Sequence, residues 1–569
     1  MLSGLSGATA SFGRDLSMQA VEIWTKYTDF MILWGCNLSA AGIHHLRFVL
    51  EAKERGVPMV VVDPYVTAVA SKSDMHLQLL PGTDTALVLG MMNHIIDCNL
   101  HNRDFIERYT FGFEALREVV REWPLERTAS VTGLSVKKIA WVAEMYATHN
   151  SMVECGMGHQ RYTNGHQAQR AISCLAAVTG NVGKPGAHCN FMEVGSAYTG
   201  FLNSEGIQNP PGANIRKTRL ISISHFGPAV REARTPPIKA VISWRGAMIT
   251  QQPDVRGMLK AVRGLDLYVC LEQQMTDDTQ WADIVLPACT LFEQWGVHPS
   301  YRHHYLQIQQ PVIAPLYESM PDIDFWCELG RRMGFHKFFP VEKTGLEWCK
   351  EFLPRSFDMT QALGPNGPVR MPERFCPSIP HMSGRFNTPS GKIELYSLMY
   401  AERGKKFPGE WNPLPVYYPP TESLQGDPNR AKKYPLHLTS QHPPYRTHSQ
   451  FYTVPSINEI DGPPWVGINA EDARERGIKD GDTVLVFNDR GEVRCQARVR
   501  NRFLRNVVEL DSGYYVKTGA NANMLMSPRA AGPRDVGKGI MQEYDFQLDG
   551  HTIPYNDCLV EIKKWEEQT

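Results

Sequence analysis

Two short apolar runs separated by a helical stretch constrain the fold of this chain more than any other feature of its sequence. Residues 30–34 (FMILW) and 57–62 (VPMVVV) have the pattern of buried strands, and residues 43–55 between them have the pattern of a helix. A strand–helix–strand order favours a parallel sheet covered by helices. Ligands bind outside the carboxyl ends of the strands in such sheets, where residues 34–37 and Asp63 stand.

A second feature is the stretch 154–191, which predicts a strand, a tight loop, a helix and another tight loop. Its first loop carries Gly156 and Gly158, and glycine lets a backbone approach a ligand where a Cβ atom would clash. Arg170 is expected at the head of the following helix, and a helix N-terminus favours an anion. Tight packing of a helix on a sheet explains the same glycines about as well, so both interpretations stay open.

The order of strand, loop and helix returns in a second unit. Residues 238–243, 265–273 and 282–288 have the pattern of strands, and a helix is expected around residues 254–263. Each of the two units thus carries a loop–helix element of the kind that binds nucleotides. Two such units suit a ligand that is itself double.

The rest of the chain changes character twice. Residues 336–435 are rich in Pro and Gly and contain only short elements, which indicates a linking region wrapped over other domains. From residue 436 onward, apolar stretches are separated by turns, which predicts a small closed barrel. The predicted fold class is therefore α/β, with two open parallel-sheet dinucleotide-binding domains and a C-terminal β-barrel. The predicted boundaries are 1–165 and 166–335 for the two α/β domains, 336–435 for the linking region and 436–569 for the barrel.

Composition excludes several classes of function. The formal net charge is −1 over 569 residues and the basic residues are scattered, so nucleic acid is not an expected partner. No apolar run is long enough to span a bilayer, and no secretory signal is recognised, so direct membrane insertion is not expected. The 12 cysteines lie far apart and form no CxxC pair, which excludes zinc or iron–sulfur ligation by local spacing. They are expected to be buried, reduced thiols.

Several motifs, in the same order along the chain, resemble the molybdopterin oxidoreductases of the dimethyl sulfoxide reductase family. Residues 34–37 (WGCN) are similar to the family's first dinucleotide loop. Residues 61–74 are similar to the segment after its second strand, although Tyr65 stands where members of the family often have Arg. Residues 80–87 (LPGTDTAL) resemble the guanine-contacting loop, in which Asp84 would accept hydrogen bonds from the N1 and N2 donors of guanine. Taken alone, this motif is explained by a plain helix N-cap.

The likeness runs from about residue 10 to the C-terminus and includes loops of the second unit and of the barrel. It implies that the cofactor is bound by Gly35, Cys36, Asn37, Asp63, Gly82, Thr83, Asp84, Gly156, Gly158, Gly246, Met248, Glu272, Thr276, Asp278, Ser440, His442, Arg446, His448, Ser449, Asn521 and Asn523.

The function that the resemblance implies is that of a catalytic subunit in anaerobic metabolism, with molybdenum or tungsten held on two molybdopterin guanine dinucleotides. Oxygen, hydroxyl or hydride would move to or from a small-molecule substrate, and an iron–sulfur subunit would pass electrons. The cofactor carries the redox chemistry, while the protein holds it and shapes the pocket. The resemblance also implies a barrel of the double-psi type. The compartment stays open: the cytoplasm is the default, and the periplasm requires an export signal ahead of this sequence.

Two residues are candidates for proton transfer. In the family the chain turns toward the metal after the motif at residues 183–186 (GKPG), which makes Glu193 the first candidate. Burial of such a carboxyl raises its pKa toward neutrality and suits it to acid–base catalysis, whereas a solvent-facing loop glutamate is the alternative. His159, on the loop between strand and helix, is the second candidate. For the protein ligand of the metal, the early candidates are Ser3 and Ser6, of which Ser3 is the predicted ligand.

Members of the family usually begin with a small domain that holds one iron–sulfur cluster, and this sequence starts at or just after the ligand region that follows it. A 4Fe–4S cluster is therefore expected only on a part outside this sequence. The chain is interpreted as a fragment, a split-gene product or a subunit completed by another polypeptide.

Two other functions stay open. One is a non-redox hydratase or transhydroxylase, near the branch with acetylene hydratase, pyrogallol transhydroxylase and catechol dehydroxylases; the other is an inactive cofactor-binding fragment.

Overall fold

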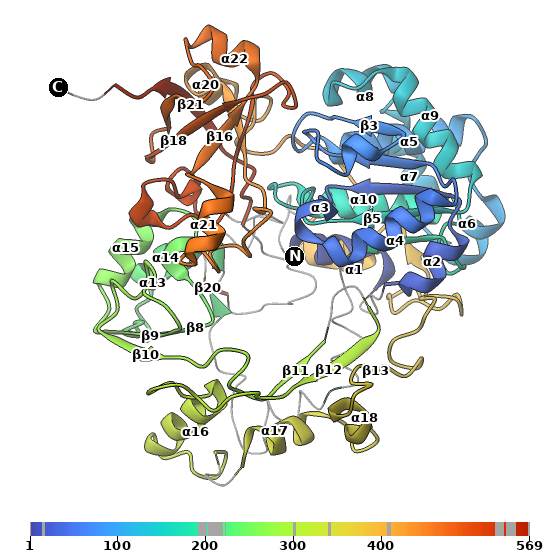
Figure 1. The fold of residues 1–569 in the computed structure, drawn as a ribbon. Coiled ribbons are helices and arrows are strands. Elements are labelled where there is room, and N and C mark those ends of the chain that lie inside the picture. The colour runs from blue at the N-terminus through green and yellow to red at the C-terminus, as the bar shows by residue number, and fades with distance from the viewer. Residues whose placement is uncertain are drawn as a thin grey trace.

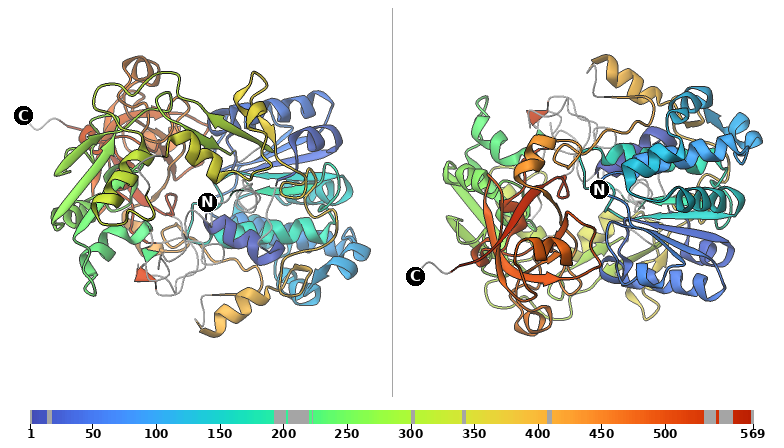
Figure 2. Two further views of the ribbon diagram at one scale, coloured as in Figure 1. Left: turned by 90° about the horizontal axis from the view of Figure 1, so that it is seen from below. Right: turned by 90° about the horizontal axis from the view of Figure 1, so that it is seen from above.

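The computed structural model describes residues 2–13, 18–191, 202, 220–221, 223–299, 303–339, 343–406, 411–529, 540–541 and 553–566. Figure 1 shows a first α/β unit (blue to cyan), a barrel beside it (orange to red), a second α/β unit below the barrel (green) and a layer of short elements at the bottom (yellow-green). Both views of Figure 2 also place the first unit on one side, with the barrel and the second unit on the other.

The first unit is built on a five-stranded parallel sheet in the order β3-β2-β1-β5-β6. Its strands are β1 (Phe30–Trp34), β2 (Met59–Val62), β3 (Met75–Leu77), β5 (Ser151–Cys155) and β6 (His188–Phe191). Every residue of β1, β2 and β5 is buried, as in a parallel sheet covered on both faces. The predicted strand–helix–strand segment is confirmed by β1, α4 (Ile43–Glu54) and β2.

Alternate residues of β1 point to two layers of core. Phe30, Ile32 and Trp34 belong to the larger cluster, which α5 (Asp84–Asp97), α9 (Val136–Thr148) and α10 (Gly165–Val178) complete. Met31 and Leu33 belong to the cluster under α2 (Val21–Tyr27) and α4. The other helices of this unit are α1 (Leu2–Phe12), α2 (Val21–Tyr27), α3 (Leu38–Ala41), η1 (Ala70–Lys72), α5 (Asp84–Asp97), α6 (Arg103–Tyr109), α7 (Phe113–Arg121), α8 (Leu125–Thr132), α9 (Val136–Thr148) and α10 (Gly165–Val178).

The first unit continues past residue 165, where a domain boundary is predicted. Helix α10 packs against α5, and β6 pairs in parallel with β5. The predicted boundary between residues 165 and 166 therefore falls inside this unit. The loop after β5 is not a boundary between domains, because α10 and β6, which follow it, complete the core of the first unit.

The second unit contains a three-stranded parallel sheet in the order β10-β9-β8, which confirms the predicted open sheet. Its strands are β8 (Ala240–Trp244), β9 (Leu267–Glu272) and β10 (Ile284–Pro287), and its helices are α13 (Phe226–Glu232), α14 (Met248–Gln251) and α15 (Val255–Arg263), preceded by η3 (Ile223–His225). An antiparallel sheet follows in the order β11-β12-β13, formed by β11 (Gly296–His298), β12 (Tyr305–Gln309) and β13 (Val369–Arg370). Helix α16 (Asp322–Arg332) lies between β12 and β13 in the chain.

The predicted linking region returns from the second unit to the first. Its strand β14 (Ile393–Glu394) pairs with β4 (Thr110–Phe111) of the first unit. Its helices are α17 (Gly345–Phe352), α18 (Met359–Leu363), α19 (Leu398–Lys406) and α20 (Pro428–Lys433). The amide of Val416 donates to Gln167 Oε1 (3.1 Å), so this region covers the start of α10, where the sequence had suggested an anion site.

The prediction that Arg170 stands at the head of its helix is wrong. Arg170 lies in the middle of α10 and is fully buried. Its Nη1 donates to the hydroxyl of Ser11 (3.0 Å), and its Nη2 donates to the carbonyls of Leu395 (2.9 Å) and Pro413 (2.6 Å). The guanidinium therefore fastens α1 and the linking region to α10, because a buried cation needs acceptors on every side. It is a structural residue here.

The C-terminal part forms a closed barrel in the order β15-β19-β16-β18-β17-β21, as predicted, with parallel and antiparallel pairs. Its strands are β15 (Leu436–Thr439), β16 (Trp465–Ile468), β17 (Thr483–Phe487), β18 (Glu492–Val499), β19 (Val507–Leu510) and β21 (Leu559–Lys564). Short helices α21 (Pro455–Asp461), α22 (Ala470–Glu475), η4 (Val516–Thr518) and η5 (Ala522–Met524) join them, and β20 (Ile540–Met541) pairs with β7 (Leu220–Ile221) outside the barrel. The double-psi topology stays a prediction. Across the described ranges, no helix has both the length and the apolar character needed to cross a membrane.

Candidate functional site

A cleft of about 760 Å³ lies where the first unit meets the barrel and the second unit. One wall is formed by the loops after β1, β2 and β5, at the carboxyl edge of the first sheet. The opposite wall belongs to the barrel and includes residues 439–442, 512–513 and 555–556. Thr250 and Gln251, at the end of α14, form a short third side. The cleft thus lies where ligands bind in open parallel sheets.

Many of the predicted site residues line this cleft. They are Gly35, Cys36, Asn37, Asp63, Gly82, Asp84, Gly156, Gly158, His159, Ser440, His442, Arg446, His448 and Asn523. Others are described by the structure but are not part of the cleft lining, namely Thr83, Gly246, Met248, Glu272, Thr276, Asp278, Ser449 and Asn521. Glu193 and the side chain of Ser3 lie outside the described residues. Ser6 is buried, and its hydroxyl lies 2.7 Å from that of Tyr400 rather than in the cleft wall.

The glycines of the loop after β5 approach a neighbouring loop. A Cβ atom on Gly156 would stand 2.2 Å from the carbonyl oxygen of Gly35, and one on Gly158 would stand 2.9 Å from the same oxygen. The amides of both glycines donate to this loop, Gly156 to the carbonyl of Trp34 (2.8 Å) and Gly158 to that of Gly35 (3.0 Å). Close packing of two loops therefore requires these glycines, and their backbone forms part of the cleft floor.

Asp84 is the first residue of α5 and is buried in the cleft wall. The expected capping by side chains is absent at this helix: the Thr83 hydroxyl donates to the carbonyl of Leu80 (2.7 Å), and Asp84 Oδ1 accepts a hydrogen bond from Trp34 Nε1 (2.7 Å). Burial raises the pKa of Asp84 to about 6. A buried carboxyl at a cleft wall gains most from a ligand that offers N–H donors, as guanine does.

Asp63 follows β2 and is buried beside Asp84. Its Oδ1 accepts a hydrogen bond from the amide of Tyr65 (3.3 Å), and burial, aided by the charge of Asp84, raises its pKa to about 7. An acidic residue at this place accepts ribose hydroxyls in dinucleotide-binding folds. The Tyr65 hydroxyl donates to Gln441 Oε1, so this tyrosine joins the first unit to the barrel.

His159 is buried on the loop between β5 and α10, with its ring edge-on to Phe191 at a centroid distance of 5.8 Å. Its Nε2 lies 2.9 Å from Gln169 Oε1, and Gln169 Nε2 donates to the sulfur of Cys189 (3.6 Å). The glutamine thus offers its oxygen, which fixes the proton of His159 on Nε2. Nδ1 has no partner among the described residues, and burial lowers the pKa of the imidazole to about 4. His159 is therefore a neutral acceptor at pH 7.

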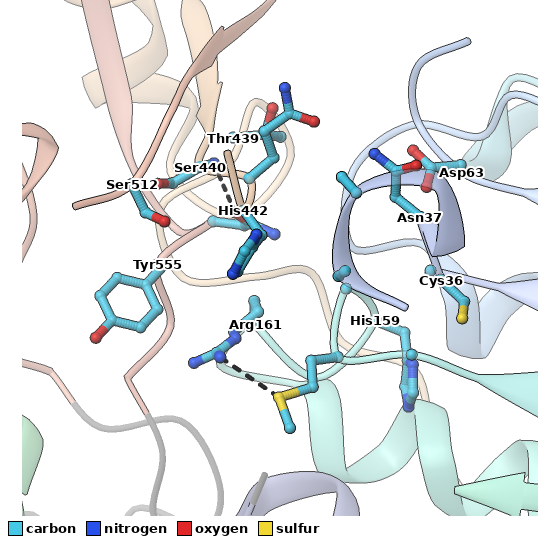
Figure 3. A pocket seen from close by; sticks show the side chains of 18 of the residues that line it. Cys36, Asn37, Asp63, His159, Arg161, Thr439, Ser440, His442, Ser512 and Tyr555 are labelled. Atoms are coloured by element: carbon cyan, nitrogen blue, oxygen red, sulfur yellow. Dashed lines mark hydrogen bonds between the residues drawn. The ribbon is translucent and has the colours of Figure 1, made fainter. Parts of the chain in front are cut away.

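The barrel contributes basic and aromatic groups, among them His442 and Tyr555 (Figure 3). His442 and His448 lie edge to face with ring centroids 5.2 Å apart, and burial lowers the pKa of both imidazoles, that of His448 to about 4. Arg446 is buried and its Nε donates to Asp461 Oδ2 (2.7 Å). Its Nη1 and Nη2 find no acceptor among the described residues. Because unpaired buried donors are costly, these two groups suit a ligand with anionic oxygens.

Among the residues predicted for the second unit, Asp278 holds α14 in place. Asp278 Oδ1 accepts hydrogen bonds from the amide of Ile249 (3.0 Å) and the hydroxyl of Tyr268 (2.9 Å). Its neighbour Asp277 accepts a hydrogen bond from the amide of Val516 (2.6 Å), which ties the second unit to the barrel. Oδ1 of Asp278 thus holds the start of α14, whereas Oδ2 has no partner among the described residues, and contact of Asp278 with a ligand stays a prediction.

Two predicted barrel residues clamp the other end of α14. The Oγ of Ser449 accepts a hydrogen bond from Gln251 Nε2 (3.2 Å). Asn521 Nδ2 donates to the carbonyls of Thr250 (2.9 Å) and Tyr514 (2.6 Å). These contacts hold Thr250 and Gln251 in the cleft lining, whereas Ser449 and Asn521 are not part of that lining.

The cleft also contains residues that were not among the predicted ones, above all Arg161 and Tyr555. Arg161 stands three residues after Gly158, and a basic residue beside a glycine loop was the available signal. Tyr555 lies in an unremarkable stretch near the C-terminus and reaches the cleft only because β21 closes the barrel. Nothing in the local sequence marks it.

A parallel sheet whose carboxyl edge forms a cleft with a closed barrel and a second α/β unit defines a multidomain protein with a nucleotide-type ligand site. The chain belongs to the molybdopterin oxidoreductase family, whose model matches residues 7–332. A model of the molybdopterin dinucleotide binding domain matches residues 436–537. The chain is thus a molybdopterin-dependent oxidoreductase by family, and the second match supports a molybdenum–pterin cofactor.

Related proteins include oxidoreductases and a hydratase. "Probable oxidoreductase YyaE" of Bacillus subtilis is 28% identical over 99% of this chain and 80% of its own length. Dimethyl sulfoxide reductase DmsA of Escherichia coli is 29% identical over 90% of this chain and 70% of its own. Acetylene hydratase of Syntrophotalea acetylenica is 27% identical over 82% of this chain and 68% of its own length. The solved structure of acetylene hydratase from Pelobacter acetylenicus has the same fold, with a TM-score of 0.75, 23% identity, and coverage of 99% of this chain and 81% of that one.

Proposed function

We propose that this chain is the larger part of the catalytic subunit of a bis-pterin molybdenum or tungsten enzyme, which moves oxygen, hydroxyl or hydride to or from a small substrate. The observation that carries the proposal is the cleft itself. It unites the carboxyl edge of the first sheet, within the region matched by the family, with barrel loops from the dinucleotide binding domain. Neither region forms this cleft alone.

The residues of the cleft fit a pterin guanine dinucleotide. Such a ligand offers N–H donors on its bases, hydroxyls on its ribose and anionic oxygens on its phosphates. Asp84 and Asp63 are buried acceptors for the first two, and the orphaned Nη atoms of Arg446 are buried donors for the third. The second dinucleotide is assigned to the second unit, around the loops that follow β8 and β9.

Once bound, the cofactor supplies the redox chemistry. The chain's own residues hold and orient it: the close-packed loops at Gly35 and Gly156 give a rigid floor, and the barrel loops cover the opposite side. His159 offers an acceptor atom, Nδ1, from a ring that stays neutral at pH 7. Ser3 remains the proposed metal ligand and Glu193 the proposed proton carrier.

Asp84→Ala tests the cofactor assignment. Loss of the carboxylate leaves guanine donors unpaired at a buried site, which weakens binding by about 1–3 kcal/mol. The amount of GMP released by acid hydrolysis per mole of purified protein should therefore fall. Glu475→Ala, at an exposed carboxylate of α22, is the control. Equal GMP release from the Asp84 variant and the wild type would remove Asp84 from the site.

Electrons are proposed to reach the site through an iron–sulfur partner. Cluster ligation normally needs closely spaced thiolates, and the cysteines of this sequence lie far apart. Eleven of the twelve cysteines are buried and only Cys98 is exposed, and no group of three or more His, Cys, Asp or Glu suited to a metal ion occurs in the parts that the structure describes. The isolated chain is expected to contain iron and acid-labile sulfide near background. A stoichiometric cluster, seen by electron paramagnetic resonance after reduction, would contradict this assignment.

A non-redox hydratase or transhydroxylase is the second candidate, favoured by the similarity to acetylene hydratase. The loaded enzyme separates the two: a hydratase turns over without consuming an electron donor, whereas an oxidoreductase consumes or delivers electrons in stoichiometric amounts. A third reading, an inactive cofactor-binding fragment, predicts bound pterin without turnover on any tested substrate.

A further inference from the structure

The second unit carries a group of large apolar side chains that face solvent. They belong to two loops, one after β10 and one before α16, which lie side by side because the amides of Val312 and Ile313 donate to the carbonyl of Phe292 (2.8 and 3.2 Å). The apolar patch, as we name it, consists of Leu291, Phe292, Val312, Ile313, Leu316 and Tyr317, each at least 46% exposed. None of the six lines the cleft. Figures 1 and 2 place the sheet of this unit (green) at the outer side of the molecule, away from the first unit.

The patch continues onto the edge of the second sheet. The amide of Met320 donates to the carbonyl of Pro287 at the end of β10 (3.3 Å), and among the described strands β10 is an edge strand paired with β9. Ile284, Val285 and Met320 are exposed as well. At about 150 Å² for a large apolar side chain, the exposed fractions of the patch and these three residues amount to roughly 800 Å². The largest apolar patch of a monomer is usually about 300–600 Å².

Glu293 holds the two loops in a fixed relation. Its carboxylate is buried, and it accepts hydrogen bonds from the amide of Thr290 (2.6 Å), the amide of Leu316 (2.7 Å) and the hydroxyl of Ser319 (3.3 Å). Tyr317 has a φ of +54°, in the left-handed region, and its side chain is fully exposed. A buried charge and a left-handed residue both cost free energy in the isolated chain. They fix the shape of the loops before any contact forms, which lowers the entropy lost on binding.

Charge is nearly absent from this surface. Residues 284–292 contain no charged side chain, and residues 311–320 contain only Glu318. Transient electron-transfer contacts are small and are steered by complementary charges, whereas permanent contacts are larger and more apolar. In a pair related by a two-fold axis, residues near the axis meet their own copies, so like charges would face each other there. A surface almost free of charge avoids this repulsion.

We propose that the apolar patch is the interface of a two-fold symmetric dimer of this chain. A standard stable interface buries about 800 Å² on each partner, and the exposed area of the patch and its border at β10 reaches this size. Tyr317, the most exposed side chain of the patch, is the expected anchor, because aromatic rings at the centre of an interface contribute most to binding. Each copy keeps its own cleft, and the inference does not depend on the proposed function.

Sedimentation equilibrium of the purified full chain tests this proposal. The wild type should form dimers and no larger species, because a two-fold contact is closed. Phe292→Asp and Tyr317→Asp should each raise the dissociation constant of the dimer by about 30- to 1,000-fold, the range of central interface residues. A rise in NaCl concentration should leave the wild-type constant unchanged or lower it, since an apolar contact has no ion pair to screen.

Ile460→Asp is the matched control, because Ile460 on α21 is 61% exposed, as Phe292 is 57% exposed, but lies outside the patch and the cleft lining. Its dissociation constant should equal that of the wild type. Circular dichroism verifies the fold of each variant, and Tyr317→Asp keeps the test valid if Phe292→Asp does not fold, since the Tyr317 side chain is fully exposed.

Two results would overturn the proposal. One is a wild type that stays monomeric up to about 100 μM, far above the dissociation constant of a stable dimer, which would assign the patch to a different polypeptide. The other is a dimer whose dissociation constant neither patch variant changes, which would place the contact between copies elsewhere on the surface.

Discussion

Exchange of Glu193 for Gln is expected to lower turnover by about 10²–10⁴-fold while the GMP content of the protein stays unchanged, because the amide keeps the shape of the side chain but cannot carry a proton. The elements before this residue favour the assignment. Strand β6 runs parallel to β5, so its last residue, Phe191, stands at the same edge of the sheet as the cleft. The Phe191 ring contacts His159, a cleft residue, and Glu193 follows two positions later.

The measurement needs the metal-loaded enzyme with a suitable electron donor and a substrate found by screening catechols, N- and S-oxides and inorganic oxyanions. The pH profile of kcat/KM is the decisive readout, since loss of a titrating group removes one limb of the profile. Glu232→Gln, at the exposed end of α13, is the control. Full turnover with an unaltered profile in Glu193→Gln would move the proton role to His159, whose Nδ1 is the available acceptor.

The helices and strands could be predicted from the sequence because buried positions produce a regular pattern of apolar residues. The apolar runs at residues 30–34 and 57–62 became β1 and β2, and the polar residues that follow them line the cleft. The same rule identified the second sheet and the barrel strands. Asp63 was found because a residue at the end of a parallel strand falls at the ligand edge wherever the rest of the chain goes. Asp84 was found through the resemblance of residues 80–87 to a guanine-contacting loop, since its local pattern alone indicates only a helix N-cap.

Residues whose role depends on distant partners could not be found in this way. Arg170 has the pattern of a helix-head cation, but its acceptors lie on α1 and in the linking region, far away in the sequence. Gly156 resembles a ligand loop, yet its nearest neighbour is the backbone of Gly35. Tyr555 enters the cleft only through closure of the barrel, and Oδ1 of Asp278 is engaged by the start of α14. Local pattern fixes where a loop emerges, whereas tertiary contacts decide which of its side chains remain available.

Beside the cleft, the barrel and the first unit enclose a group of buried carboxyls that makes stability depend on pH. Glu509 on β19 is fully buried; its Oε2 accepts a hydrogen bond from Arg502 Nη2 (2.9 Å), and its Oε1 has no partner among the described residues. Burial, with the charges of Asp511 and Asp63 and against the attraction of Arg502, raises the pKa of Glu509 from 4.5 to about 8. Burial likewise raises the pKa of Asp511 to about 7.

Glu509→Gln is therefore expected to make the ligand-free chain more stable at alkaline pH. In the folded chain Glu509 keeps its proton up to about pH 8, but in the unfolded chain only up to about 4.5. The folded state thus binds more protons in this window, and the free energy of unfolding falls as pH rises, by up to about 1.4 kcal/mol per pH unit. Glutamine removes this dependence while its oxygen can still accept from Arg502.

The thermal midpoints of variant and wild type should be similar near pH 5 and differ by several degrees at pH 8.5, with the variant higher. Glu492→Gln, an exposed change on β18, should leave the curve unaltered, and parallel curves for Glu509→Gln and wild type from pH 5 to 8.5 would show that Glu509 is already ionised in the folded chain.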